Sequence, residues 1–300
     1  MTTISIIIPT YNAGQYIEEA LASVFAQSFQ DFEVIIIDDG STDDTAQKIK
    51  TLSDPRILYV YKENQGPAAA RNYGLNLVRG EYIAFLDVDD LWESHKLEMH
   101  LNLMKSFPLM GMSFSWFQIL FDQPIQRFES PWFTPPKKQI LSFGDFLERN
   151  WTGHSSSVVL RTQCMRDCKG FDESLYTGED YYLWLQIAQR GWGIGFLPEA
   201  LSIYRRRTGS LTVDHLQIAL DNLKLMECLA AQVDSQHVSI VNRAVSLSWL
   251  DVAWSSLKKG HPADSLGAFK KGYRAVPQFA VERFARKFIT KTISLGREAV

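Results

Sequence analysis

Short runs of β-branched and aromatic residues alternate with helical patterns over the first ninety residues, and this alternation constrains the fold most. Four runs predict buried strands, namely Ile4–Pro9, Phe32–Asp38, Ile57–Tyr61 and Tyr82–Asp87. Apolar residues follow the first run at the spacing of one helix face, at Ile17, Ala20, Leu21, Val24 and Phe25. Two further helices are expected, one after Ser41 with Asp44 as capping partner and one over Ala68–Leu77. Repeated strand, helix and strand predict a mostly parallel sheet with right-handed crossovers.

The alternation loosens after Asp90. A helix is expected over His95–Lys105 and a strand over Gly111–Phe121. Four prolines in the stretch Pro124–Lys138 predict an extended surface loop. The other elements expected before residue 210 are a helix opened by Ser142 and Asp145, a strand over Ser155–Leu160 and a helix over Asp180–Arg190.

The pattern is helical throughout from Leu216 onward, so we expect two domains, residues 1–212 and 213–300. The spacing of apolar and small residues between Trp249 and Pro277 is typical of one tetratricopeptide-type helical hairpin. A single such hairpin must pack on neighbouring helices to bury its apolar face. The segment Arg283–Arg297 mixes basic and apolar residues, which predicts an amphipathic helix. A solvated terminal helix is the simpler interpretation, and peripheral membrane contact through this basic helix is the alternative.

The charge balance and the cysteines exclude several classes of protein. The chain carries 31 basic and 34 acidic side chains, a net charge of -3, which does not favour nucleic-acid binding. Three cysteines are too few for a disulfide framework, so we expect reduced thiols and a cytoplasmic location. The N-terminus has no signal-peptide pattern, and the longest apolar stretch, Leu109–Phe121, falls short of the ~20 residues that span a bilayer. The protein is expected in solution or at the inner face of the membrane.

Polar clusters follow three of the predicted strands. They are Pro9–Asn12, Asp38–Ser41 and Asp87–Asp90. Ligands of open α/β sheets bind at the carboxyl ends of the strands. A single acidic strand end is usually a helix cap or a turn, whereas three such clusters at one edge predict a ligand site.

The sharpest cluster is Asp87-Val88-Asp89-Asp90, which follows the wholly apolar run Tyr82–Leu86. Three carboxylates among four residues repel one another unless a cation lies between them. Oxygen ligands suit Mg²⁺ or Mn²⁺, with part of the coordination shell left to substrate phosphates. In isolation such a motif would be explained more simply as a cap of the following helix.

The clusters occur in order with two further motifs. Thr10-Tyr11-Asn12 and Asp38–Ser41 are followed by Gly66–Gly74 and then by Gly80–Asp90. Over roughly residues 4–210 this string resembles the family 2 glycosyltransferases of the GT-A fold. The resemblance implies a Rossmann-like α/β fold, a mixed and mostly parallel sheet flanked by helices, here with an all-α C-terminal extension.

The resemblance also implies a nucleotide-sugar site at these strand ends. Its expected members here are Thr10, Tyr11, Asn12, Asp39, Arg71 and Asp87. Tyr11 would lie against the base, Asp39 would accept a hydrogen bond from a uracil-type ring N–H, and Arg71 would reach the base or the diphosphate. Asp89 would be the main metal ligand, and Asp87 would hold the ribose or a metal-bound water.

Two later motifs gain roles from the same resemblance. The pair Glu179-Asp180 would supply the catalytic base, Asp180, with Glu179 orienting donor or acceptor hydroxyls. Acidic residues also stabilise helix N-termini, and alone the pair would be read that way. Arg205 and Arg207 would contact the diphosphate, with Arg207 standing where family members often carry histidine. His154 lies in a segment that resembles the acceptor side and ranks below Asp180 as a base.

The sequence thus predicts an inverting glycosyltransferase that uses Mn²⁺ or Mg²⁺ at Asp89 and Asp87. The expected donor is a nucleotide-diphosphate sugar, with UDP-sugar preferred, and the acceptor is a hydroxyl of a saccharide or a lipid-linked saccharide. A processive synthase is disfavoured because Gln189-Arg190-Gly191-Trp192 lacks the Gln-x-x-Arg-Trp spacing. A dehydrogenase is disfavoured because no Gly-x-Gly-x-x-Gly turn follows the first strand. A non-catalytic nucleotide-sugar-binding subunit of an assembly complex stays open as the alternative, and so does homo-oligomerisation.

Overall fold

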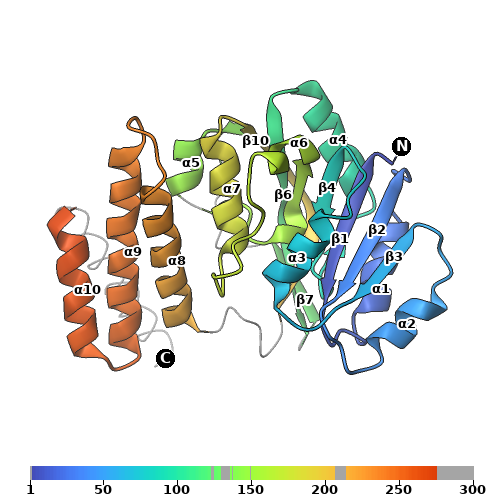
Figure 1. Cartoon of the computed structure of the whole chain (residues 1–300), viewed down its shortest axis with the longest axis horizontal. Coiled ribbons are helices and arrows are strands. Elements are labelled where there is room, and N and C mark those ends of the chain that lie inside the picture. The colour runs from blue at the N-terminus through green and yellow to red at the C-terminus, as the bar shows by residue number, and fades with distance from the viewer. Residues whose placement is uncertain are drawn as a thin grey trace. The chain divides into compact units, whose positions relative to one another are not determined.

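The computed structural model describes residues 2–122, 125–129, 136, 138–148, 150–206 and 214–275. The chain divides into two compact units. One unit comprises Met1–Ser174 and Glu179–Ser210, and the other comprises Leu175–Gly178 and Leu211–Val300. Within the described residues the first unit carries the β-sheet and the second carries helices α8, α9 and α10 (Figure 1).

The first half of the sheet is parallel, as the strand–helix alternation predicts. Its order is β3-β2-β1-β4, and each strand begins at the residue that the sequence predicts. The strands are β1 (Ile4–Thr10), β2 (Phe32–Asp38), β3 (Ile57–Tyr61) and β4 (Tyr82–Phe85). The helices that connect them are α1 (Ile17–Phe25), α2 (Thr45–Thr51) and α3 (Pro67–Leu75). The carboxyl ends of β1, β2 and β4 therefore meet at one edge of the sheet.

The second half of the sheet is mixed, because β9 runs antiparallel to both of its neighbours, β4 and β6. The sheet continues from β4 in the order β9-β6-β10-β5, with β7 beside β6 and β8 beside β10. These strands are β5 (Leu91–Trp92), β6 (Met110–Asp122), β7 (Ile125–Glu129), β8 (Ile140–Leu141), β9 (Val158–Arg161) and β10 (Gly193–Arg206). The predicted mixed sheet flanked by helices is confirmed, and parallel pairing in this half joins β6 to β10.

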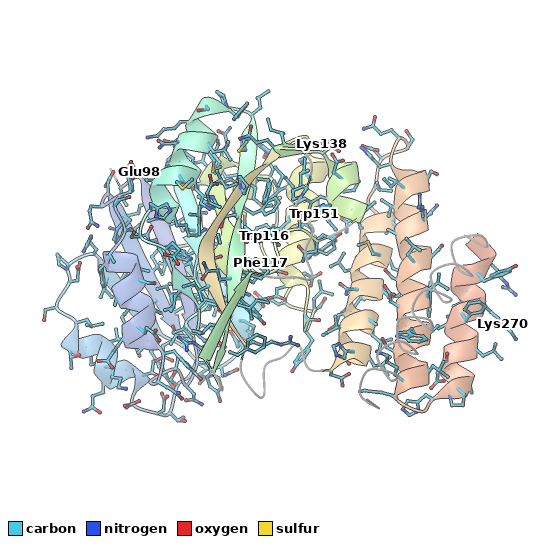
Figure 2. The ribbon with its side chains drawn as sticks, turned by 180° about the vertical axis from the view of Figure 1, so that it is seen from behind. Glu98, Trp116, Phe117, Lys138, Trp151 and Lys270 are labelled. Atoms are coloured by element: carbon cyan, nitrogen blue, oxygen red, sulfur yellow. The ribbon has the colours of Figure 1, made fainter. Side chains whose placement is uncertain are left out.

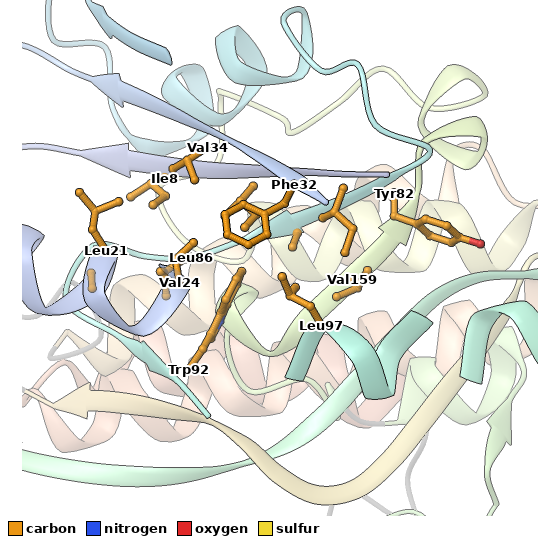
Figure 3. Packing of buried hydrophobic residues seen from close by; sticks show 14 of the residues in the cluster. Ile8, Leu21, Val24, Phe32, Val34, Tyr82, Leu86, Trp92, Leu97 and Val159 are labelled. Carbon is orange, nitrogen blue, oxygen red and sulfur yellow. The ribbon is translucent and has the colours of Figure 1, made fainter. Parts of the chain in front are cut away.

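Alternate residues of the parallel strands face opposite layers of helices. On one face Ile6, Ile8 and Val34 pack with Leu21 of α1 and Leu97 of α4 (Lys96–Ser106), as Figure 3 shows in part. On the other face the cluster consists of Ile35, Ile37 and Ala70, with Val60, Leu77 and Val78 packed against it. Both faces are covered, which explains why these strands read as continuous apolar runs.

Helix α3 approaches the sheet closely because it carries a glycine at the contact. A Cβ built on Gly74 would lie 2.7 Å from Cγ2 of Ile7. The helix starts at Gly66, whose φ of 93° suits glycine, and Pro67 occupies the first turn. Arg71 is thereby carried toward the sheet and is buried.

Helix α7 (Glu179–Gln189) is fixed by aromatic contacts. The ring of Trp184 lies 6.1 Å from the rings of Phe85 and Phe171, centroid to centroid. The hydroxyl of Tyr181 donates a hydrogen bond to the Phe146 carbonyl at 2.8 Å. Phe146 belongs to α5 (Phe143–Glu148), where Ser142 and Asp145 form the predicted reciprocal cap. The start of α7 is therefore anchored at the β4 end of the sheet.

The second unit is helical over its described part. It contains α8 (His215–Ala230), α9 (Val238–Lys258) and α10 (Pro262–Ala275). Its buried cluster is Ala219, Leu223, Val252, Ala253 and Ala268. Gly272 lets α10 approach Leu250 of α9, since a Cβ at this glycine would lie 2.7 Å from the Leu250 side chain. The predicted all-α extension is confirmed, and the predicted basic helix Arg283–Arg297 lies outside the described residues.

Several local predictions are wrong. The run Ile57–Tyr61, expected to be a buried strand, is the terminal strand β3, and its Leu58 and Tyr61 side chains are exposed because only one edge of β3 is paired. Ser155–Ser157 is a 3-10 turn (η1) rather than the first half of a strand, and β9 begins at Val158. Strand β7 (Ile125–Glu129) forms within the stretch expected to be a surface loop. Helix α2 begins at Thr45 because Ser41 and Thr42 are held in the preceding loop by side chains of Asp38 and Asn12. None of the helices in the described residues is long and apolar enough to cross a membrane.

Candidate active site

The ends of β1 and β2 are locked together and form one side of the candidate site. The Asp39 amide donates to the Thr10 carbonyl at 2.8 Å. Asn12 adopts a φ of 46°, a conformation that asparagine tolerates, and its side chain accepts from the Thr42 amide at 2.8 Å. Its own amide donates to Ser41 Oγ at 2.9 Å. Asn12 thus holds two loops together within the region expected to bind the nucleotide.

Tyr11 and Thr10 differ sharply in exposure. The Tyr11 side chain is exposed, with a relative accessibility of 52%, whereas Thr10 is buried at 2%. An exposed aromatic ring at the carboxyl edge of a parallel sheet is suited to stack on a planar ligand. Thr10 uses its hydroxyl within its own strand, where it donates to the Ile8 carbonyl at 3.2 Å.

Asp39 is buried and already accepts hydrogen bonds from three residues. Lys62 Nζ donates to Oδ1 at 2.5 Å, and the backbone amides of Gln65 and Gly66 donate at 3.0 Å and 2.7 Å. The two amides belong to the chain that enters α3, so Asp39 fixes the start of that helix. The expected uracil contact remains a prediction, and it would place a base beside Lys62 as well as Asp39.

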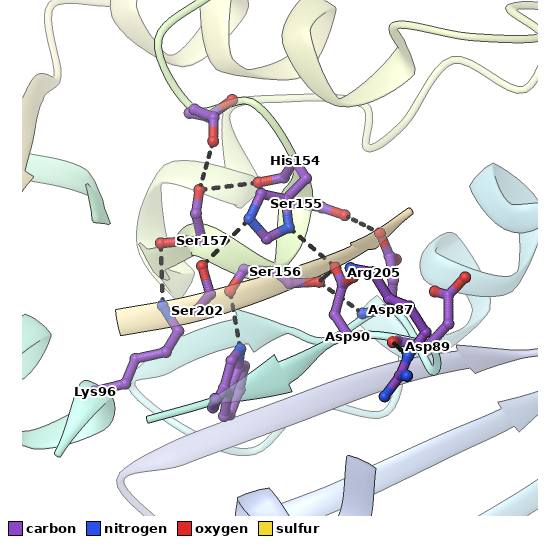
Figure 4. A network of polar contacts seen from close by, with 12 residues as sticks. Asp87, Asp89, Asp90, Lys96, His154, Ser155, Ser156, Ser157, Ser202 and Arg205 are labelled. Atoms are coloured by element: carbon purple, nitrogen blue, oxygen red, sulfur yellow. Dashed lines mark hydrogen bonds and ion pairs between the residues drawn. The ribbon is translucent and has the colours of Figure 1, made fainter. Parts of the chain in front are cut away.

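The Asp87–Asp90 segment is a tight turn whose two ends are fastened by protein donors (Figure 4). The Asp90 amide donates to the Asp87 carbonyl at 2.8 Å and closes the turn. Asp87 accepts from Arg71 Nη2 at 2.6 Å through Oδ1 and from Ser155 Oγ at 2.9 Å through Oδ2. Burial by itself raises the pKa of Asp87, but Arg71 outweighs it and holds the pKa below its ordinary value. Asp87 is therefore an ionised carboxylate.

Asp90, at the other end of the turn, is almost fully buried and accepts three hydrogen bonds. Ser156 Oγ donates to Oδ2 at 2.6 Å, and the Arg205 amide donates to Oδ1 at 2.9 Å. His154 Nδ1 lies 3.0 Å from the same Oδ2, and its Nε2 lies 3.2 Å from Ser202 Oγ. These contacts give Asp90 a structural role and place His154 behind the turn.

Arg71 joins the turn to the start of α7. Its Nη2 contacts Asp87 at 2.6 Å, its Nη1 contacts Glu179 Oε1 at 2.7 Å, and its guanidinium lies over the Phe171 ring. Burial lowers the pKa of Arg71, but the two carboxylates outweigh it and raise that pKa. The side chain is 5% exposed. In the structure it bridges two acidic residues, and the expected contact with a base or diphosphate stays a prediction.

Asp180 lies in the same group of charges. Burial is the largest of the causes that raise the pKa of its carboxyl. The negative charges of Glu179 and Asp87 raise the pKa further, and the positive charge of Arg71 lowers it. The resulting pKa is about 7. Its Oδ1 accepts from the Tyr181 amide at 2.6 Å, which fixes the carboxylate at the start of α7. A carboxyl with a pKa near neutrality is suited to act as a general base.

Asp89 occupies the third position of the turn and is half-buried. Its carbonyl accepts from Arg205 Nε at 2.9 Å. Among the described residues no group of three or more His, Cys, Asp or Glu side chains forms a ready-made metal cage. A site of one or two carboxylates still fits Mg²⁺ or Mn²⁺, because such ions often complete their shell with water and substrate phosphates.

Arg205 is held against the turn rather than directed at an open site. Its Nη2 pairs with Glu19 at 2.7 Å, and its guanidinium lies 5.3 Å from the centroid of the Tyr16 ring. Together with its bonds to Asp89 and Asp90, this makes Arg205 a link between β10 and the Asp87–Asp90 turn. Its expected diphosphate contact stays a prediction, and Arg207 lies outside the described residues.

Ser155 and Ser156 of η1 belong to the segment that resembles the acceptor side, but the sequence did not predict their contacts with the Asp87–Asp90 turn. Ser155 contacts Asp87, and Ser156 contacts both ends of the turn. Behind them Phe117 of β6, labelled in Figure 2, packs on the His154 ring with 4.8 Å between the centroids. Three serines in a row directly before an apolar strand can be recognised in the sequence, but the sequence does not indicate which residues their hydroxyls contact.

Comparison with known proteins agrees with this geometry. Residues 5–175 match the model of the family described as glycosyl transferase family 2. An uncharacterized glycosyltransferase of Rickettsia felis is 35% identical over 228 residues, which cover 70% of this chain and 34% of that protein. The chain therefore spans about a third of the length of that relative.

Two characterised proteins are also similar. The Escherichia coli protein WfgD, named a UDP-Glc:alpha-D-GlcNAc-diphosphoundecaprenol beta-1,3-glucosyltransferase, is 34% identical over 185 residues, covering 61% of this chain and 69% of WfgD. The crystal structure of S. aureus TarS residues 1–349 with UDP-GlcNAc has a TM-score of 0.69 at 20% identity, covering 93% of this chain and 83% of that one. At this identity the likeness shows the fold alone. With its family match over more than half its length, the chain belongs to the family 2 glycosyltransferases.

Proposed function

We propose that this protein is an inverting, metal-dependent glycosyltransferase that moves a sugar from a UDP-sugar to a hydroxyl of a lipid-linked saccharide. The observation that carries the proposal is Asp180, whose pKa of about 7 arises in the same charge group as Asp87 of the metal turn. Direct displacement at an anomeric carbon needs a base for the acceptor hydroxyl and a group that stabilises the leaving diphosphate, which a cation can supply.

The acceptor hydroxyl is the nucleophile in this scheme. Asp180 takes its proton as the oxygen forms a bond to the anomeric carbon from the face opposite the leaving diphosphate. One displacement inverts the anomeric configuration. Glu179, held by Arg71 at 2.7 Å, keeps the start of α7 and hence Asp180 in place. Arg71 also neutralises charge that would otherwise raise the pKa of Asp180 further.

Asp89 is the proposed direct ligand of the Mn²⁺ or Mg²⁺ ion, with Asp87 as the supporting ligand. The choice of Asp89 follows the family motif that the sequence resembles, and the carboxylate oxygens of Asp87 and Asp90 accept from protein donors. When bound, the ion stabilises the negative charge of the departing diphosphate. Arg207 is proposed to add positive charge to the same group.

The nucleotide of the donor is inferred from the hydrogen-bonding groups that its base would meet. Asp39 is an acceptor, and Lys62 Nζ, 2.5 Å from it, is a donor. Uracil presents a ring N–H beside a carbonyl oxygen, so this pair complements it, whereas cytosine and adenine have no ring N–H on that edge. Guanine shares this pattern with uracil, and the similarity to WfgD, which is named for UDP-Glc, favours uracil. Tyr11 is placed to stack on the ring.

The acceptor is inferred by similarity. WfgD is named for an acceptor made of GlcNAc on a diphosphate lipid, and the proposal extends that class of acceptor to this protein. An acceptor of this kind lies in a membrane, so we propose that the protein works at the inner membrane face from the cytoplasm. Contact through residues 283–297 and homo-oligomerisation are further parts of the proposal.

A donor panel tests the proposal directly. Purified protein is incubated with UDP-glucose, UDP-GlcNAc or GDP-mannose, with a GlcNAc-diphosphate lipid and with Mn²⁺ or EDTA. We expect release of UDP from one UDP-sugar, dependent on both metal and acceptor. Binding of UDP-sugar without turnover of any donor would instead favour a non-catalytic subunit, and no binding of any nucleotide would refute the proposed function.

A further inference from the structure

The turn that carries Asp89 is pinned at its first and fourth residues. The hydrogen bond from the Asp90 amide to the Asp87 carbonyl fixes its shape, and Val88 is buried beneath it. Where the third residue of such a turn points depends on how firmly the two ends are held. The groups that hold both ends therefore help to set the place of the Asp89 carboxylate, together with Arg205, whose Nε donates to the Asp89 carbonyl at 2.9 Å.

One side chain contacts both ends of the turn. Ser156 Oγ accepts from the Asp87 amide at 2.9 Å and donates to Asp90 Oδ2 at 2.6 Å. A hydroxyl has a single proton, and an ionised carboxylate can only accept, so the two bonds have fixed directions. Ser156 is completely buried, and its carbonyl accepts from Trp92 Nε1 at 2.9 Å. Its position is thus fixed by the backbone as well as by the hydroxyl (Figure 4).

We propose that Ser156 is a positioning residue for metal binding, which clamps the Asp87–Asp90 turn so that Asp89 presents its carboxylate to the cation. This role rests on the proposed function for its metal, but the clamp itself does not. Ser156 touches neither substrate nor metal in this scheme. It acts through the backbone of Asp87 and the side chain of Asp90.

The adjacent residue supplies a matched control. Ser157 is also completely buried, and its Oγ lies 2.9 Å from the carbonyl oxygens of both Thr152 and His154. It makes no hydrogen bond to the turn among the described residues. Ser157→Ala therefore removes a buried hydroxyl of the same kind from the same 3-10 turn without touching the clamp.

Two readouts separate the clamp from a general loss of stability. Hydrogen exchange of a peptide that spans the turn reports whether the Asp87 and Asp90 amides are held. Calorimetric titration with Mn²⁺ in the presence of UDP reports the metal affinity. In Ser156→Ala we expect faster exchange in this peptide and about tenfold weaker Mn²⁺ binding, the factor typical of one lost buried hydrogen bond. In Ser157→Ala we expect both readouts to match the wild type.

Equal changes in the two variants, or none in Ser156→Ala, would overturn the inference. If Ser156→Ala showed faster exchange but unchanged Mn²⁺ affinity, Ser156 would stabilise the turn without positioning Asp89 for the metal, and the positioning role would be refuted. If the wild type itself bound neither Mn²⁺ nor UDP, the proposed function would fail together with the metal role, while exchange would still report the clamp. Cysteine variants at both positions replace the hydroxyl with a weakly hydrogen-bonding thiol and repeat the comparison should an alanine variant fail to fold.

Discussion

Replacing Asp180 with Asn should make the protein more stable at neutral pH while it abolishes transfer. The folded-state pKa of this carboxyl is about 7 against an ordinary value of 3.8. Between these values the folded protein keeps a proton that the unfolded chain has lost, so the contribution of Asp180 to stability falls as the pH rises. Above pH 7 the penalty is complete and amounts to about 4 kcal/mol at most, from 1.36 kcal/mol per pKa unit. Asn carries no charge and keeps the acceptor for the Tyr181 amide.

Urea unfolding of the wild type and of Asp180→Asn at pH 5 and pH 8 measures this effect. We expect Asp180→Asn to exceed the wild type by about 1 to 4 kcal/mol at pH 8 and by much less at pH 5. Glu227→Gln, which removes an exposed carboxylate of α8, is the control and should show no such pH dependence. An equal difference at both pH values, or a less stable Asp180→Asn at pH 8, would refute the raised pKa that burial and the charge of Glu179 give to Asp180.

Three further outcomes follow from the site. The rate of transfer should rise about tenfold per pH unit below pH 6 and level off above about pH 7, because Asp180 must lose its proton to act as a base; a flat pH–rate profile would contradict this. Arg71→Met leaves Asp87 and Glu179 buried without their cation, so it should lower the free energy of unfolding by about 3 to 5 kcal/mol, measured by urea titration. Lys62→Met removes the proposed donor to the base and should weaken UDP binding about tenfold by calorimetry, with unchanged affinity counting against that contact.

The sequence predicts those strands and polar motifs whose residues are consecutive in the chain. The buried strands β1, β2 and β4 can be recognised as apolar runs, and the polar residues that follow them meet at one edge of the sheet. The run Ile57–Tyr61 also forms a strand, β3, but it lies at the end of the sheet and is only half-buried. The Asp87–Asp90 motif and the acidic pair at the start of α7 stand out for the same reason. Each can be recognised from a few consecutive residues.

The connections between these motifs were not predictable, because they join residues far apart in the chain. Arg71 bridges Asp87 and Glu179, and nothing in the sequence of its helix indicates that its guanidinium would pair with two carboxylates. Strand β10 was missed because Pro198 and Glu199 interrupt its apolar pattern, at the point where its pairing with β6 shifts register. The sequence of Ser155–Ser157 resembles the start of a strand, and only the structure shows that the hydroxyls of Ser155 and Ser156 bond to the Asp87–Asp90 turn.

The stereochemistry of the product tests the central claim most directly. Transfer from UDP-α-D-glucose, or from whichever UDP-sugar the panel selects, to a GlcNAc-diphosphate lipid can be followed by proton NMR at the anomeric position. A single displacement with Asp180 as base predicts a β-linked product from the wild type and none from Asp180→Asn, although that variant should still bind UDP with Mn²⁺. An α-linked product, or transfer by Asp180→Asn at the wild-type rate, would contradict the account.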